Sequence, residues 1–397
     1  MSEPSTMYRC VEGLRLTDFR GGRLELVGAG VSVPATEMAR KIAVHFEKDA
    51  HWADFALADV QEAKLEFQKM KAAGIIGEAG AVKPAETSGP EPERPVQTMF
   101  GAPFRALADI GPGEIVFLGA PIDIGTTGIP GARFGPDAIR SASLERYRCR
   151  LDVATGGMIA WNVPSLGGAV LGGAHLSDAG NVVYAAGEPQ SAYYDRLSAA
   201  VRAVFAAKGF PVILGGDHSI TYSTVPDPCE ALVHLDAHCD LAPLVTGHCH
   251  HHGNVLTRLL SENRVGEVHH FGLRDTSGWD TVDAGTFGKS VGDLERPDWT
   301  AGIDGKEVFV SLDVDVLDPG ILPGTGTPVI GGLTLRQLCQ ALSQIIRCTR
   351  PVGLDLVELC PTRDRDGLSA RVAIEALLCF LAVYHEVHVK SSQRLAQ

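Results

Sequence analysis

The chain has 397 residues, of which 45% are hydrophobic and 21% are charged, and its formal net charge is −13 at pH 7. This length suits one large α/β domain with an appendage, or two domains. The acidic balance and the lack of a basic block in the sequence argue against nucleic acid or an anionic membrane surface as a partner.

The sequence predicts neither a membrane span nor an export signal. No apolar run reaches the length of about 18 residues that a bilayer requires, and residues 1–10 lack a basic-then-apolar pattern. The 9 cysteines are scattered, odd in number and without a CxxC pair, which is typical of reduced thiols. We therefore expect a cytoplasmic protein.

Residues 1–100 differ from the rest and are expected to form an N-terminal extension with a linker, before a main domain over residues 101–397. Val33–Ile76 is rich in Ala, Glu, Lys and Met and predicts helices, whereas Gly77–Val96 has the Gly, Pro and Glu content of a linker. We interpret the extension as a packing or oligomer-contact element. The alternative is that it reaches an active site, its own or that of a neighbouring subunit.

From about Gly113 the pattern becomes one of strands alternating with helices. Strands are predicted at residues 114–118, 182–184, 210–214, 231–235, 308–315 and 353–357, and helices at residues 137–147, 191–208, 254–260, 335–348 and 369–384. Such alternation predicts a parallel sheet that is covered by helices on both faces.

Three of the predicted strands end in side chains that can bind metal. The strand at residues 210–214 is followed by two glycines, an aspartate and a histidine. The strands at residues 231–235 and 308–315 lead into acids or histidines that are spaced two apart. Residues spaced in this way point to the same side of an extended chain. Open α/β sheets place their sites at these carboxyl ends. The candidate ligands are His218, Asp236, His238, Asp240, Asp313 and Asp315.

Six ligands that include four carboxylates are too many for one structural zinc ion, which prefers four nitrogen or sulfur ligands. They suit two divalent ions that share bridging carboxylates, and oxygen and imidazole ligands favour Mn, Ni, Co or Fe. An isolated aspartate or histidine is more often a helix cap or a satisfied polar group. The same alternation at several strand ends favours metal binding.

These segments resemble the metal-binding motifs of the ureohydrolase family, which includes arginase and agmatinase. The matching residues are Gly215–Ser219, Asp236–Asp240 and Ser311–Pro319, while Pro130–Pro136 and Pro323–Gly332 are similar to the agmatinase branch. The resemblance covers about residues 113–384. It implies a three-layer α/β/α arginase-like fold with a central parallel sheet, to which the helical extension is added, and assembly as a homotrimer or homohexamer.

The resemblance also implies a role for each site residue. His218 and Asp240 would bind one metal, His238 and Asp315 the other, and Asp236 and Asp313 would bridge the two. His252 matches the histidine that shuttles protons, and Glu358 matches the carboxylate that holds the guanidinium. The implied reaction is attack of a metal-bridging hydroxide on the guanidinium carbon, with release of urea and an amine. The expected cofactors are two divalent ions, Mn²⁺ or Ni²⁺, and a metal-loading chaperone is considered as a partner.

Departures from the agmatinase pattern concern the substrate. The segment Gly247–Gly253 holds four histidines, and besides His252 the roles of His248, His250 and His251 are open: exposed loop residues, hydrogen-bond donors behind the ligands, or an accessory metal-loading site. With the long extension, these differences resemble guanidine hydrolases, so we expect guanidine and water to give urea and ammonia.

Guanidinobutyrase and agmatinase activities are the main alternatives to guanidine hydrolysis. Formiminoglutamase chemistry is disfavoured by the agmatinase-like segment Gly324–Pro328, and a deacetylase site would need only a single zinc ion. An inactive assembly or regulatory homologue is also considered, but all six candidate ligands are present.

Overall fold

The computed structural model describes residues 91–390 except 153, 245–249, 276–285 and 297, together with six short strands between residues 7 and 78. The chain forms two compact units, Met1–Gly89 with Ala185–Ala192, and Pro90–Tyr184 with Tyr193–Gln397. The expected division at residue 100 stays a prediction.

The described part of residues 1–89 consists of strands. Strand β1 (Met7–Cys10) pairs antiparallel with β5 (Ala50–His51) and β6 (Ile76–Glu78). A second antiparallel sheet joins β2 (Leu14–Thr17), β3 (Arg23–Leu26) and β4 (Val31–Pro34).

Helix was therefore the wrong prediction for the residues of Val33–Ile76 that belong to β4, β5 and β6. The rest of that predicted helical stretch, residues 35–49 and 52–75, lies outside the described residues. Pairing with a distant strand such as β1 overrides local propensity, and composition alone does not reveal it.

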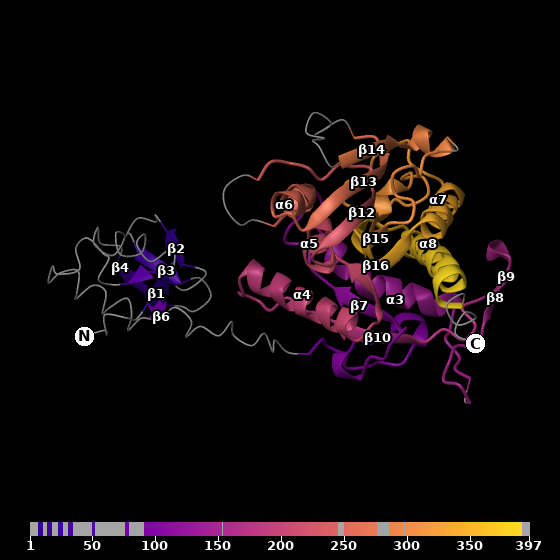
Figure 1. Ribbon diagram of the computed structural model, residues 1–397, viewed down its shortest axis with the longest axis horizontal. Helices are drawn as coiled ribbons and strands as arrows, with labels where there is room; N and C mark the ends of the chain where they lie inside the picture. Colours follow the sequence, from indigo (N-terminus) through magenta and orange to yellow (C-terminus); the bar gives the residue numbers. More distant parts are fainter. Residues whose placement is uncertain are drawn as a thin grey trace. The chain divides into compact units, whose positions relative to one another are not determined.

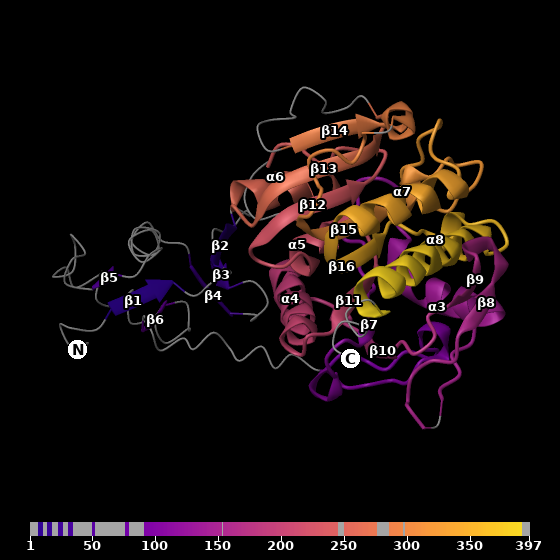
Figure 2. The same ribbon diagram turned by 45° about the vertical axis from the view of Figure 1, so that its right-hand side comes forward.

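The second unit is built on an eight-stranded sheet in the order β10-β7-β11-β16-β15-β12-β13-β14, with all neighbouring pairs parallel (Figures 1 and 2). This confirms the expected parallel sheet. Its strands are β7 (Ile115–Ala120), β10 (Leu176–Asn181), β11 (Phe210–Gly215), β12 (Cys229–Leu235), β13 (Val265–Leu273), β14 (Thr286–Ser290), β15 (Glu307–Asp313) and β16 (Arg350–Val357). A separate hairpin joins β8 (Trp161–Val163) and β9 (Gly168–Val170).

Helices cover both faces of the sheet and give the predicted three layers. One layer is formed by α3 (Gly135–Arg146), α7 (Leu335–Cys348) and α8 (Leu368–Tyr384), and the other by α4 (Gln190–Ala206), α5 (Thr221–Thr224) and α6 (Val255–Ser261). Strand β12 shows how the faces alternate. Val233 packs in the core beneath α7 and α8, whereas Leu232 packs in the core beneath α6.

Helix α8 is the apolar centre of its layer. Together with the helical turns that follow it, α8 forms the stretch Leu368–Lys390, which is long and apolar enough to cross a membrane, yet 61% of its most apolar window is buried inside the fold. A helix that is hydrophobic on every side is expected at the core of a large domain.

Local sequence predicted some elements better than others. Helix α7 has the predicted bounds, and Thr334 and Gln337 form a reciprocal cap at its start. The strand predicted at residues 182–184 is wrong, because the strand beside β7 is Leu176–Asn181. That strand contains Ser, Asp, Gly and Asn, which have low strand propensity, so its position is set by the sheet and not by its composition.

Candidate metal centre

The candidate ligands and Glu358 meet at the carboxyl ends of four neighbouring strands, β11, β16, β15 and β12. His218 opens the short helix after β11, Asp313 ends β15, and Glu358 directly follows β16. Asp236, His238 and Asp240 follow β12. The structure thus brings together all six predicted ligands from three segments that are far apart in the sequence.

Two histidines face the carboxylates at short distances. His218 Nδ1 lies 3.0 Å from Asp236 Oδ2, 3.1 Å from Asp240 Oδ2 and 3.2 Å from Asp313 Oδ2. His238 Nδ1 lies 3.0 Å from Asp315 Oδ2 and 3.3 Å from Asp236 Oδ1. Asp236 therefore contacts one histidine through each of its two oxygens, which is the arrangement that a carboxylate shared by two ions requires.

The centre carries more buried negative charge than protein groups alone balance. Burial and the charges of Asp315 and Asp236 raise the pKa of Asp313 well above its usual value. Burial and the charge of Asp236 raise the pKa of Asp315 to about 6. Burial lowers the pKa of His238, but its contacts with Asp236 and Asp315 outweigh this and raise it to about 12. Divalent cations would relieve this repulsion.

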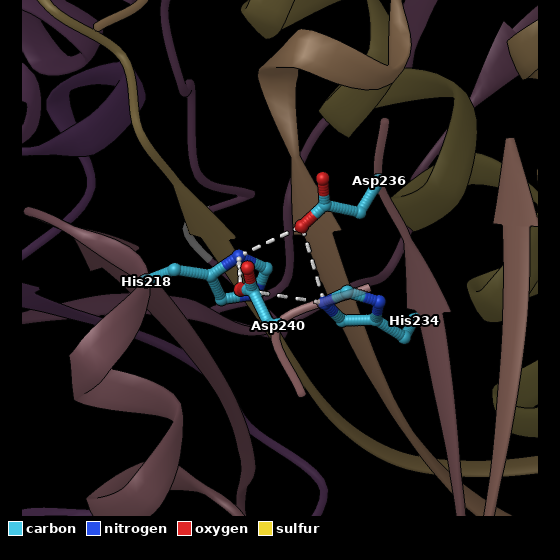
Figure 3. A group of neighbouring side chains, drawn as sticks. All are labelled: His218, His234, Asp236 and Asp240. Carbon is cyan, nitrogen blue, oxygen red and sulfur yellow. Dashed lines mark ion pairs between the residues drawn. The ribbon is translucent and has the colours of Figure 1, made fainter. Parts of the chain in front are cut away.

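The donor atoms fit metal ions chemically. His218 Nδ1 and Asp236 Oδ2 are buried and make no hydrogen bond in the structure, although they lie 3.0 Å apart. Buried polar atoms are rarely left in this state unless a ligand satisfies them. The donor atoms form two groups, and within each group they lie within 4.8 Å of one another. The first group is His218, His234, Asp236 and Asp240, and the second is Asp236, His238 and Asp315. Figure 3 shows the first group.

A hydrogen-bond chain behind His218 sets its tautomer. Asp355 accepts hydrogen bonds from the hydroxyls of Ser311, Thr221 and Thr224 at 2.6, 2.9 and 2.6 Å. Because the Ser311 hydrogen is used in this way, its oxygen accepts the Nε2–H of His218 at 2.8 Å. The lone pair of His218 is then on Nδ1, the atom that faces the carboxylates. Sequence reasoning missed Ser311 and Asp355, although both lie near the motifs.

His252 and Glu358 form a second buried pair at the edge of the centre. His252 Nε2 accepts the backbone N–H of Thr127 at 3.0 Å, so its hydrogen is on Nδ1 and is donated to Glu358 Oε1 at 3.0 Å. The same Glu358 oxygen accepts the backbone N–H of His218 at 2.9 Å. Burial lowers the pKa of His252, but Glu358 outweighs this effect and raises it. The two predicted catalytic residues thus contact each other.

Two residues of this site have unfavourable backbone angles. Asp240 and Glu358 both lie in the left-handed region, with φ of 51° and 62°. Such angles cost free energy in residues other than glycine and persist where the surrounding contacts hold them. The glycine pair before His218 serves close packing, because a Cβ on Gly216 would lie 1.7 Å from the carbonyl oxygen of Ile122. That contact brings β7 and β11 together beneath the metal centre.

A cavity of about 400 Å³ opens on the centre. It is lined by His218, His238, Asp240, Asp313, His252 and Glu358, by Thr127, Thr327, Asp275 and Gly253, and by the segment Cys239–Pro243. A larger hollow of about 810 Å³ lies between α7, α8 and residues 165–171. In the described part of the chain it contains no cluster of metal-ligating side chains, so we assign the site to the smaller cavity.

The histidine-rich segment does not form an accessory cluster in the described residues. His250 is only 6% exposed and lies between the rings of Tyr194 and Tyr222, with centroids 4.3 and 4.5 Å away. Of the three roles considered, that of a solvent-exposed loop residue does not apply to His250, because two aromatic rings cover it. His251 is half-buried and His248 lies outside the described residues.

His234 belongs to the metal-competent group and was missed in the sequence. It lies on β12, two residues before Asp236, with its side chain fully buried. The alternation that pointed to Asp236, His238 and Asp240 extends back to His234. That signal was available, but it was hidden inside a run of apolar residues.

The fold and the donor set define a metal-dependent hydrolase of the three-layer α/β/α type. The arginase family model matches residues 113–382. The chain is 34% identical over 295 residues to agmatinase of Gallus gallus, which covers 68% of this chain and 81% of that protein. It is 32% identical over 297 residues to the mitochondrial guanidino acid hydrolase of Homo sapiens, which covers 69% of this chain and 79% of that protein.

A solved structure gives the same result. Proclavaminate amidino hydrolase from Streptomyces clavuligerus superposes with a TM-score of 0.59 at 28% identity, and the match covers 74% of this chain and 98% of that one. The chain therefore belongs to the arginase family, whose members are binuclear-metal hydrolases of guanidino compounds, and its relatives include agmatinases.

Proposed function

We propose that this protein hydrolyses free guanidine to urea and ammonia at two divalent metal ions, Mn²⁺ or Ni²⁺. The observation that carries the proposal is the charge of the cavity. Its described lining contains Glu358 besides four of the candidate ligands, and no lysine or arginine. Segments 245–249 and 276–285, which follow lining residues in the chain, contain no lysine or arginine either. Such a lining suits a small cation and offers no partner for the carboxylate of a guanidino acid.

The proposed ligand assignment follows the contacts. His218 and Asp240 would hold one ion, His238 and Asp315 the other, and Asp236 and Asp313 would be shared. When bound, the two ions lower the pKa of water and supply a hydroxide at neutral pH. The four carboxylates balance the charge of two divalent ions.

Glu358 and His252 would handle the substrate. Guanidinium is a planar cation whose N–H groups match carboxylate oxygens, so an ionised Glu358 at the cavity wall would orient it. Because Glu358 Oε1 also accepts from His252, it fixes the imidazole next to the substrate. His252 would take a proton at Nε2 and deliver it to the leaving nitrogen. The hydroxyl oxygen of Thr127 lies 2.7 Å from His252 Nε2. This hydroxyl can rotate so that its oxygen accepts a hydrogen bond from the protonated Nε2.

Agmatinase activity is the second candidate, and one residue favours it. Asp275 lines the cavity, its side chain is 30% exposed, and it lies 3.9 Å from His238 Nε2. A carboxylate at this position would attract the ammonium end of a tailed guanidino substrate. Assembly as a homo-oligomer belongs to the guanidine proposal.

Urea release tests the two candidates. Purified protein, loaded separately with Mn²⁺ and Ni²⁺, is assayed with guanidine, agmatine, 4-guanidinobutanoate and arginine. We expect the highest kcat/KM with guanidine, and Asp275→Asn should change this value little. A higher kcat/KM with agmatine that Asp275→Asn lowers would replace guanidine by agmatine as the substrate.

A further inference from the structure

His234 and His270 form a buried pair directly behind the candidate metal centre. They lie opposite each other on β12 and β13, and both side chains are fully buried. Their Nδ1 atoms are 3.0 Å apart. The ring of His234 also stacks on that of His218, with centroids 4.8 Å apart and an interplanar angle of 24°. These contacts fix the position of the His234 ring, and its Nε2 atom faces the carboxylates.

His234 Nε2 lies 3.2 Å from Asp236 Oδ2 and 3.9 Å from Asp240 Oδ2. Figure 3 shows this nitrogen directed at the two aspartates, with a dashed line to each. Two interpretations are possible: the nitrogen carries a lone pair and binds a metal, or it carries a hydrogen that points to the carboxylates. The partner histidine distinguishes them.

Two facing Nδ1 atoms can share only one hydrogen. If His234 bound metal through Nε2, its hydrogen would be on Nδ1 and His270 would accept it. The hydrogen of His270 would then be on Nε2, which is buried and has no hydrogen-bond partner. In the opposite arrangement His270 donates from Nδ1, and its Nε2 is an acceptor without a partner. His234 Nε2 is likewise buried without an aligned hydrogen bond, but its hydrogen would face the carboxylate oxygens of Asp236 and Asp240, which lie 3.2 and 3.9 Å away. A buried N–H that faces carboxylates costs less free energy than one that faces no acceptor, so the second arrangement is favoured.

We propose that His234 is a positioning residue that directs its Nε2–H at Asp236, the shared carboxylate, and that His270 holds it in this tautomer. The inference rests on the proposed metal site and adds two residues behind it. Asp236 Oδ2 also faces His218 Nδ1, so a hydrogen directed at this oxygen would hold the carboxylate between the two ions. Loss of a residue that hydrogen-bonds to a metal ligand, without binding the metal itself, typically lowers metal affinity about 10–100-fold.

The first test is a crystal structure of the Mn²⁺-loaded wild-type protein, followed by neutron diffraction of deuterated crystals. We expect no metal bond to His234 Nε2, and deuterium on His234 Nε2 and His270 Nδ1. A metal–Nε2 bond of about 2.1 Å would overturn the proposal. So would deuterium on His270 Nε2 with none on Nδ1.

Variants of the neighbouring strand give an independent test in solution. His270→Leu removes the donor and should lower Mn²⁺ affinity about 10–100-fold, measured by chelator competition. His270→Gln keeps an N–H donor and should restore most of the affinity. His269→Leu is the matched control, because His269 is the buried neighbour that contacts Glu267 and Phe287 instead of the centre.

The outcomes separate this inference from the proposed function. Wild-type affinity in folded His270→Leu protein would overturn the positioning role alone, as would equal losses in His270→Leu and His269→Leu. A wild-type protein that bound no divalent metal would overturn the proposed function and this inference together.

Discussion

The protein has two clusters of buried charge on one sheet, and they are built in opposite ways. At β10, Arg140 and Asp178 are both fully buried and joined by two hydrogen bonds of 2.8 and 2.9 Å. Asp178 also accepts the backbone N–H groups of Met99 and Gly180. Charge and hydrogen bonds are balanced there by protein groups alone.

The metal centre lacks this balance. Four carboxylates gather around His218 and His238, and buried donor and acceptor atoms make no hydrogen bonds. Asp236 and Asp315 of the metal centre are nearly as buried as Asp178, so burial does not mark the functional cluster. Excess charge of one sign with unsatisfied atoms marks a site that is completed by something outside the chain, whereas a balanced cluster serves the fold.

The largest expected effect is that of Asp313→Asn. The loss of a shared ligand should reduce metal content and bring turnover below detection. In the metal-free protein the same change should increase the free energy of unfolding, because it removes a carboxylate whose pKa burial and neighbouring charges raise. Metal analysis, urea assays and denaturant titration measure the three quantities. A metal-free variant that is less stable than wild type would contradict this account of the centre.

His252→Ala should lower kcat about 10²–10⁴-fold while both metals are retained, because the residue lies beside the ligands and not among them. His251→Ala, the change at the adjacent half-buried histidine, is the control and should leave kcat nearly unchanged. Loss of metal from the His252 variant would show that a proton-shuttle role is the wrong assignment.

Arg140→Met tests the balanced cluster. It leaves Asp178 buried without its cation, so we expect a loss of about 3–5 kcal/mol in the free energy of unfolding. Metal affinity of the folded fraction should stay the same. Arg371→Ala removes an arginine from an exposed pair with Glu145 and serves as the control, with no measurable loss. Equal effects of the two variants would mean that the buried pair is not a stabilising element.

Ser311→Ala should weaken metal binding about 10–100-fold, because His218 loses the acceptor that fixes its tautomer. Chelator competition measures this loss. Ser343→Ala, a change on the helix α7, is the control. Unchanged affinity in the Ser311 variant would show that the tautomer of His218 is fixed by other contacts.

The smallest expected effect is on the pH dependence of stability. Burial raises the pKa of Asp315 to about 6, so the folded metal-free protein binds more protons than the unfolded chain between about pH 4 and 6. The contribution of Asp315 to stability should therefore fall as pH rises through this window. Asp315→Asn should remove that part of the pH dependence, as measured by denaturant titration of metal-free protein at pH 5 and 7. Identical pH dependence in both proteins would contradict the prediction.

The sequence by itself determined the fold class and the candidate ligands. Alternating strands and helices predicted the parallel sheet, because each element carries its own hydrophobic period. Side chains spaced two apart at strand ends predicted that Asp313 and Asp315 belong together, because the geometry of an extended chain is local. The bounds of α7 were also predicted from the local pattern of the sequence.

Only the tertiary structure decided how these parts meet. The strand order that places β16 and Glu358 between β11 and β15 depends on pairing over long sequence distances. The tautomer of His218 depends on Asp355, more than a hundred residues away, through Ser311. The position of His234 behind Asp236 depends on His270 from the neighbouring strand. Such contacts arise from packing, which no local pattern of residues encodes.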